Sequence, residues 1–450
     1  MQEIRVLSPC GGLGYGFPQA SIDAAMCRDP HIIAVDAGST DPGPHYLGSG
    51  EGTLSRDAQK NDLTVLMAAR HKANIPLVVG SAYTAGARPH VEKTVAIIRE
   101  IAKENGYRFK LAVIKADIDK ELLKQNLERG RVRDFEHPDS LTSETIERSR
   151  HIVAQMGVEP IIEALKSGAD VIIAGRSYDP AIMAALPILH GFDKGLAFHM
   201  GKILECGAYA AEPQSSADSM LGIIRSDHFE VEPTNPALRC TVDSVAAHTL
   251  YEKESPVELH LPGGMIDLKK TTFEAVDDRT VRVAKTRFYP SDQYTLKLEG
   301  AKAIGYRSLF IAGVRDPIFI DQVDEIVADA EAKVKSGVGY TAESYRLHFS
   351  VYGKGAVLMA PKVNDVVPAE LGIVGEVVAD TQEIAHSVCS FAHGVLLHTH
   401  YPGRKTVAGN LAFPYSPSDF DLGEVFEFSI YHLLEVDDPT SLFQVMLERI

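Results

Sequence analysis

The chain has 450 residues, 45% of them hydrophobic and 24% charged, a composition typical of folded globular proteins rather than disordered ones. Its formal net charge of −16 would repel nucleic-acid phosphates and anionic membrane surfaces, so we expect neither as a partner. Five widely spaced cysteines without a Cys-x-x-Cys pair exclude a zinc ribbon and a disulfide framework. There is neither an apolar signal region nor a run of ~20 apolar residues, which predicts a cytoplasmic protein.

Short apolar runs alternate with amphipathic stretches over residues 4–200, a pattern typical of strand–helix–strand units around a parallel sheet. A stretch at 89–103 has one apolar face and is followed by Gly106, which predicts a helix and its end. The predicted strands are residues 4–7, 32–35, 77–79, 109–114 and 171–174.

After about residue 215 the pattern changes to alternating strands with many turn residues, beginning with 257–261, 280–283 and 295–298. Further strands are predicted at 347–351 and 373–378, followed by a helix that Asp380 and Glu383 would open as a capping box. We therefore expect a three-layer, mostly parallel α/β domain over residues 1–215 and a smaller mixed α+β domain over 216–450.

A glycine loop follows the first predicted strand. The backbone amides around Gly12, Gly14 and Gly16 are placed to hold a carboxylate or phosphate of the substrate. A dinucleotide fingerprint would require a third glycine where Phe17 stands, so we expect no nucleotide cofactor. A tight turn that only packs a helix onto the sheet is the structural alternative.

Two more polar loops follow buried strands. Asp36 and Ser39 lie in a loop of acids and hydroxyls that could supply a base or bind a divalent ion, or form an ordinary Asx-rich turn. Arg176, followed by Asp179, could fork onto a substrate carboxylate or form an internal ion pair with Asp179 or Asp36. Because the carboxyl ends of parallel strands share an edge, we expect the glycine loop, the Asp36 loop and the Arg176 turn to converge.

The segment around Glu205 places a carboxylate beside the thiol of Cys206 and follows both with Gly207. Carboxylates and thiols can exchange protons or bind metals, and glycine lets the backbone approach a neighbour closely. A packing helix that carries one exposed Glu and one buried Cys is the alternative. We expect Glu205 to transfer a proton, whereas Cys206 either donates one or packs.

Glu205-Cys206-Gly207-Ala208 resembles the Glu-Cys-Gly-Ala motif of the acyclic terpene utilisation (AtuA-type) family. The turn at 174–179 resembles that family's Gly-Arg-x-x-Asp turn, and the loop at 11–17 its opening; the chain departs from the family pattern at Lys202 and Tyr209. The resemblance implies a catabolic enzyme. It also implies a small ferredoxin-fold companion subunit, and hence an oligomer.

Two groups near the C-terminus are ambiguous. His386, Cys389 and His393 share one helical stripe, which is either a metal site or a solvated face, opposite the apolar residues Ile384, Val388, Phe391 and Val395. His398, His400 and Arg404 could form an anion pocket or an ordinary helix terminus with cations placed against its dipole.

Together these patterns favour a lyase, most directly a hydratase or dehydratase of a small or branched carboxylate or its acyl-CoA thioester. Adding or removing water beside a carbonyl requires an acid/base pair and donors that stabilise enolate-like charge. Glu205 is the preferred proton-transfer residue, Asp36 the second candidate base, and Arg176 the carboxylate anchor. No cofactor is predicted, although a divalent metal stays open. The alternatives are a nicotinamide-dependent oxidoreductase and a non-catalytic, acyl-ligand-binding subunit of a heteromeric enzyme.

Overall fold

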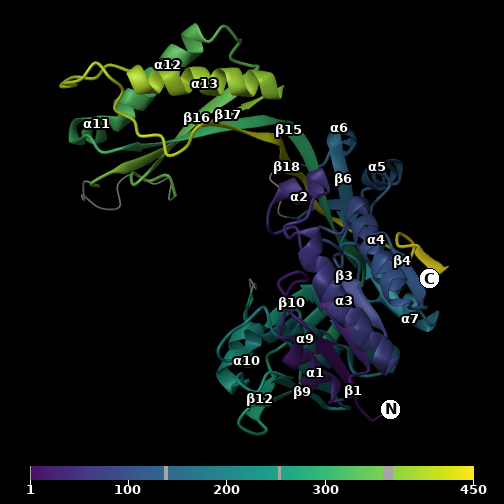
Figure 1. The fold of residues 1–450 in the computed structure, drawn as a ribbon. Coiled ribbons are helices and arrows are strands. Elements are labelled where there is room, and N and C mark those ends of the chain that lie inside the picture. The colour runs from purple at the N-terminus through teal and green to yellow at the C-terminus, as the bar shows by residue number, and fades with distance from the viewer. Residues whose placement is uncertain (1, 136–139, 252–254, 358–367) are drawn as a thin grey trace. The chain divides into compact units, whose positions relative to one another are not determined.

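The structure is a computed structural model that describes residues 2–135, 140–251, 255–357 and 368–450 (Figure 1). The chain forms two compact units: unit 1 comprises residues 1–302 and 428–450, and unit 2 comprises residues 303–427. The chain leaves unit 1 along strand β15 (Tyr294–Val314) and returns to it along β18 (Asp419–Val436). Unit 2 is therefore an insertion in the sequence of unit 1.

The largest sheet of unit 1 has ten strands among the described residues. Their order is β12 (Thr272–Ala275), β13 (Val281–Ala284), β9 (His228–Pro233), β8 (Met220–Ile224), β1 (Ile4–Ser8), β2 (Ile32–Asp36), β3 (Leu77–Gly80), β7 (Val171–Ala174), β4 (Lys110–Ile114) and β19 (Val445–Arg449). The central strands from β1 to β4 pair in parallel and confirm the strands predicted for the N-terminal part of the chain. Antiparallel strands flank them on both sides, so the sheet is mixed.

Helices cover both faces of this sheet, which is why its central strands are almost continuously apolar. One face packs against α1 (Gln19–Met26), α3 (Arg56–Ala73) and α4 (Arg88–Asn105), and the other against α7 (Glu159–Lys166), α8 (Asp179–Leu189) and α9 (Lys194–Leu204). Helix α4 is the helix predicted at 89–103, and Gly106 ends it in the left-handed conformation at φ 68°. The remaining helices of unit 1 are α2 (Pro44–Ser49), α5 (Lys120–Glu128), α6 (Ser143–Arg148), the short 3₁₀ helix at Gly207–Ala210 and α10 (Val242–Thr249).

Strands after residue 215 continue the sheet that the N-terminal part of the chain begins. Strand β8 pairs antiparallel with β1, and β9 pairs with β8, so the boundary expected near residue 215 falls inside unit 1. Unit 1 also contains a smaller antiparallel sheet of β10 (Glu258–Leu261), β11 (Gly264–Asp267) and β14 (Arg287–Pro290). Strand β6 (Ser149–Ala154) pairs with the first part of β15, and β5 (Val132–Asp134) with the last part of β18.

Unit 2 has the chain order strand, helices, strand, strand, helix, strand. Its sheet order is β16 (Tyr345–Tyr352), β17 (Leu371–Ala379), β15 and β18, which is the ferredoxin-like arrangement. Helices α12 (Val323–Gly337) and α13 (Gln382–His398), with the short α11 (Pro317–Asp321), share a core with the strands (Figure 1). Thr381, not Asp380, caps α13: its side chain accepts a hydrogen bond from the amide of Ile384, so the predicted capping box is wrong.

The five cysteines are free thiols, as their spacing predicts. No helix in the described part of the chain is long and apolar enough to cross a membrane.

Candidate functional site

The carboxyl ends of the parallel strands of unit 1 bring four loops to one edge of the sheet. The amide of Leu13 donates to the carbonyl of Asp36 at 3.1 Å, which joins the glycine loop to the loop after β2. The amide of Ser81, directly after β3, donates to the carbonyl of Gly175, and the amide of Arg176 donates to the carbonyl of Gly86, both at 3.1 Å. The amide of Ala37 donates to the carbonyl of Gly80 at 3.0 Å and links the two pairs of loops, which confirms the expected convergence of the glycine loop, the Asp36 loop and the Arg176 turn.

Glycines allow these loops to touch backbone to backbone. A Cβ atom on Gly207 would lie 2.6 Å from the amide nitrogen of Gly11, and one on Gly86 would lie 2.2 Å from that of Arg176. Both glycines also adopt positive φ angles, +60° and +65°, which residues with side chains rarely adopt. The Glu205-Cys206-Gly207 turn thus packs directly against the glycine loop.

Arg176 lies at the centre of a buried ion-pair network. Its Nε donates to Glu299 Oε2 at 2.7 Å and its Nη1 to Asp179 Oδ1 at 3.0 Å, and the Arg176 and Glu299 side chains are 3% and 0% exposed. Lys297 Nζ and Thr40 Oγ1 also contact Glu299 Oε1, at 3.1 and 2.9 Å. Burial alone would raise the pKa of Glu299, but Arg176 and Lys297 outweigh it and hold the pKa at about 2. Of the two sequence interpretations of Arg176, the structure has the internal ion pair.

The sequence predicts Asp179 as a partner of Arg176 but does not predict Glu299, which lies 123 residues further along the chain. A partial signal was present: Lys297 lies in the predicted strand 295–298, and Glu299, one residue beyond its predicted end, would share a face with Lys297 if the strand continued, as β15 does. Two charges on one face of a strand in a buried sheet require partners.

Asp36 is a buried carboxylate at the centre of the same edge. It is 8% exposed, and its Oδ1 atom has no hydrogen-bond partner among the described residues. Burial raises the pKa of Asp36 well above its usual range, the negative charge of Asp179 raises it further, and Arg176 opposes the shift. Burial likewise raises the pKa of Asp179, against the positive charges of Arg176 and Lys202.

The loop after β3 contributes strained backbone, which sequence analysis missed. Ser81, Tyr83 and Thr84 adopt positive φ angles of 44°, 61° and 144° without being glycines. The hydroxyl of Ser81 accepts hydrogen bonds from Arg176 Nη1 and from the amide of Ser177, both at 3.2 Å. Such conformations cost free energy and cluster at functional sites, where the surrounding structure enforces them.

Glu205 ends helix α9 and is buried, but it is not an isolated acid. Lys202, one turn earlier and also buried, places its Nζ 2.5 Å from Glu205 Oε1. Lys202 is one of the two positions at which the chain departs from the family pattern, so the departure supplies the cation that neutralises Glu205. Burial, and then the charges of Glu205 and Asp179, raise the pKa of Tyr178, which places these side chains in one electrostatic cluster.

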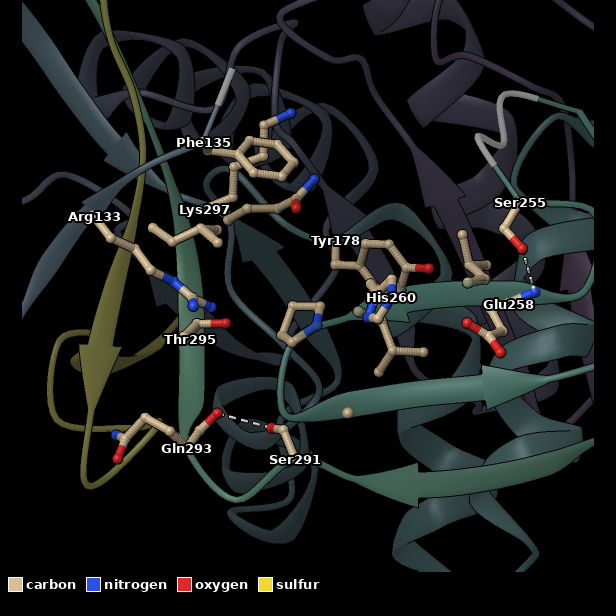
Figure 2. A pocket seen from close by; sticks show the side chains of 16 residues that line it. Arg133, Phe135, Tyr178, Ser255, Glu258, His260, Ser291, Gln293, Thr295 and Lys297 are labelled. Carbon is tan, nitrogen blue, oxygen red and sulfur yellow. Dashed lines mark hydrogen bonds between the residues drawn. The ribbon is translucent and has the colours of Figure 1, made fainter. Parts of the chain in front are cut away.

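A cavity of about 510 Å³ adjoins this cluster within unit 1 (Figure 2). Tyr178 and Lys297 belong to its wall. Lys297 pairs with Glu299, and the charge of Asp179 acts on Tyr178, so these two side chains connect the cavity to the cluster. Figure 2 shows Arg133, Thr295 and Lys297 on one side of the cavity and Tyr178 and His260 on the other. Sequence analysis did not find this cavity, because its walls come from segments distant in the chain.

A model of the acyclic terpene utilisation family, AtuA, matches residues 60–222 and 231–415. The chain belongs to this family. The matched segments contain Arg176, Glu205 and Glu299, whereas the glycine loop and Asp36 precede them. No curated protein and no solved structure matches the chain.

In this AtuA family member the amides of the glycine loop already have an anionic acceptor. The amides of Gly14 and Gly16 donate to Oδ2 of Asp62 on α3, at 2.7 and 3.1 Å. Gly12 accepts a hydrogen bond from the Cys10 thiol through its carbonyl. A substrate carboxylate or phosphate would have to displace the carboxylate of Asp62 to bind these amides.

Ser39 and Arg404, two further candidate binding residues of this AtuA member, form local hydrogen bonds. Ser39 Oγ donates to Asp41 Oδ2 at 2.8 Å and accepts from the Asp41 amide at 3.1 Å, as in an ordinary polar turn. Arg404 lies in unit 2, where its guanidinium donates to the carbonyls of His398, Thr399, Thr406 and Ala408. Arg404 therefore stabilises the end of α13, as the alternative interpretation stated.

The histidine and cysteine stripe of α13 differs from the expectation. Cys389 lies in the core of unit 2, whereas Phe391, expected to pack there, is 39% exposed, because the helix is rotated relative to the predicted apolar face. His386 Nδ1 and His393 Nδ1 each lie 3.0 Å from a carboxylate of β18, Asp421 and Asp419 respectively. Among the described residues, no group of three or more His, Cys, Asp or Glu side chains is placed to hold a metal ion.

Proposed function

We propose that this AtuA family member is a catabolic lyase, a hydratase or dehydratase that acts on a small or branched carboxylate or on its acyl-CoA thioester. Asp36 carries the proposal: its carboxyl group is buried, its pKa is raised, and Oδ1 has no hydrogen-bond partner among the described residues. Such a group keeps its proton to higher pH and can donate it to a leaving hydroxyl.

Elimination of water needs a base as well as an acid. Glu205 supplies the second carboxylate, and its negative charge contributes to the raised pKa of Asp36. In the proposed step Glu205 takes the proton from the carbon beside the carbonyl, and that bond's electron pair forms the double bond. The C–O bond breaks towards oxygen, which takes the proton of Asp36 and leaves as water. Arg176 acts as a positioning residue, because Glu299 and Asp179 already bind its guanidinium.

The test is turnover of the purified chain on a panel of hydroxyacids and enoyl-CoA esters. Asp36→Asn and Glu205→Gln should each lower turnover by about 10²-fold or more, the scale of general acid/base catalysis. Asp41→Asn is the matched control, because Asp41 is an exposed acid of the same loop. Full turnover in Asp36→Asn, or no turnover of any member of the panel by the unmodified chain, would refute the proposal.

A non-catalytic subunit that binds an acyl ligand is the second candidate, and the cavity beside Tyr178 and Lys297 favours it. A nicotinamide enzyme has less support, because Asp62 binds the glycine-loop amides that a pyrophosphate would need. Calorimetric titration with NADH and with a short acyl-CoA separates these candidates. A small ferredoxin-fold companion subunit and an oligomeric assembly belong to the same proposal, and light scattering with and without that companion tests them.

A further inference from the structure

We propose that the cavity walled by Arg133, Lys297 and Tyr178 binds a free monocarboxylate with an apolar chain, and that Arg133 is its carboxylate anchor. The inference deepens the proposed function by naming the substrate class, and it rests on that function for the chemistry that follows binding. Binding itself can be measured without turnover.

Arg133, unlike Arg176, has a guanidinium that is available to a ligand. Arg176, the anchor expected from the sequence, is buried and donates to Glu299, Asp179 and the Ser81 hydroxyl. Arg133 on β5 lines the cavity, and its guanidinium makes no hydrogen bond or ion pair with any described residue. Arg133 therefore keeps the planar set of donors that matches a carboxylate.

The charged groups of the cavity wall favour an anionic ligand. An ammonium group has three N–H donors, and Lys297 uses two of them, on Glu299 and on the Tyr431 hydroxyl. The acid of the cavity wall, Glu258, is already paired with Lys269 at 2.7 Å. Lys297 is paired with Glu299 and Glu258 with Lys269, so among the described wall residues Arg133 carries the unpaired positive charge, and such a site attracts an anion.

The size of the cavity and its apolar wall residues suit a ligand with an apolar chain. Leu259, Leu261 and Pro262 give the cavity an apolar side, and Figure 2 shows Tyr178 and His260 on the side opposite Arg133. The volume of about 510 Å³ lies in the ordinary range for small ligands, and an acid of about eight carbons is of suitable size. Coenzyme A carries several phosphate charges, but Arg133 and Lys297 are the charged donors among the described wall residues. The wall therefore suits a free carboxylate better than a coenzyme A thioester.

The experiment is calorimetric titration of the full chain with octanoate, with octanamide and with octanoyl-CoA. Octanoate should bind, whereas octanamide, which lacks the charge, should bind on the order of tenfold to a hundredfold more weakly. Arg133→Gln should weaken octanoate binding by a similar factor and leave octanamide unchanged. Arg131→Gln is the matched control, because Arg131 is two residues away and forks onto Asp437 at 2.9 and 2.7 Å.

Three results would overturn the inference: no binding of octanoate, equal binding of octanoate by Arg133→Gln, or tighter binding of octanoyl-CoA that is insensitive to Arg133→Gln. Failure of the proposed function looks different. Octanoate binding that depends on Arg133, together with unchanged turnover in Asp36→Asn, would support the binding site and refute the lyase proposal. Loss of turnover in Asp36→Asn with Arg133-independent binding would keep the lyase and remove this site.

Discussion

Units 1 and 2 place the same kinds of charged residues in different surroundings. In unit 1 Arg176 and Glu299 pair with 3% and 0% of their side chains exposed, whereas in unit 2 Arg307 and Glu376 pair with 36% and 35% exposed. Water screens the second pair far more than the first, so breaking the two should have very different energetic costs. We therefore expect burial, more than residue type, to decide how much an ion pair of this chain contributes to the free energy of unfolding.

The largest effect should come from Arg176→Gln. The substitution leaves Glu299 buried with Lys297 as its remaining cation, and loss of one partner of a buried pair costs about 3–5 kcal/mol. Urea unfolding, followed by a probe in unit 1, measures it. Arg307→Gln in unit 2 is the control: Arg307 pairs with Glu376 at 3.0 Å in a half-exposed position and should contribute less than ~1 kcal/mol. Equal losses in the two variants would break the comparison.

Glu205→Gln should have the next largest effect on stability. The amide can still accept a hydrogen bond from Lys202, but it no longer neutralises that buried cation, and we expect a loss of about 1–3 kcal/mol. Adding Lys202→Met should cost less than the sum of the two single changes, which a double-mutant cycle detects. Strict additivity would mean that the pair does not interact energetically.

Asp36→Asn should have a smaller effect, and one that depends on pH, because Asp36 forms no ion pair with any described residue. With its folded-state pKa raised, Asp36 contributes stability that is fully present below the unfolded pKa of about 3.9 and is lost as pH rises through the folded value. The melting temperature of Asp36→Asn, relative to that of the unmodified chain, should therefore be higher at about pH 8 than at about pH 5. Asp41→Asn should follow the unmodified chain at both pH values, and a parallel profile for Asp36→Asn would show that Asp36 does not titrate there.

The smallest effect is expected for His386→Gln, which breaks the exposed pair with Asp421. We expect a change of less than ~1 kcal/mol in urea unfolding of unit 2. A loss comparable to that of Arg176→Gln would mean that exposure does not govern these pairs, and the contrast between the units would disappear.

The sequence predicted the elements that depend on local pattern. The central strands from β1 to β4 and helix α4 were all recognisable, because buried parallel strands are short apolar runs and α4 has an apolar stripe. The pairing of β8 with β1 could not be predicted, because it joins Met220–Ile224 to Ile4–Ser8 without a local signal in either segment. The expected boundary near residue 215 depended on that missing information.

In the candidate site, too, residues with a local sequence signal were predictable and residues that depend on long-range contacts were not. Asp36, Arg176 and Asp179 were recognisable because each directly follows a predicted parallel strand. Glu299 and Lys202, which neutralise Arg176 and Glu205, were missed: the first is distant in sequence, and the second appeared as a departure from a family pattern. The guanidinium of Arg133 is available to a ligand, whereas that of Arg176 is not. This difference depends on tertiary contacts, which residue spacing does not reveal.

The insertion of unit 2 into unit 1 also determines the order in which the molecule can fold during synthesis. Strand β19 pairs with β4 at the edge of the large sheet, and the end of β18 pairs with β5. Strands β4 and β5 therefore lack these partners until residues 428–450 have been synthesised. At about 5–20 residues per second, a ribosome takes roughly 17–66 s to translate the chain between Ile114 and Val445, and for that time the outer edge of β4 lacks its strand partner. An unpaired edge is a template for aggregation, so we expect the nascent chain to depend on chaperones until its last strand emerges.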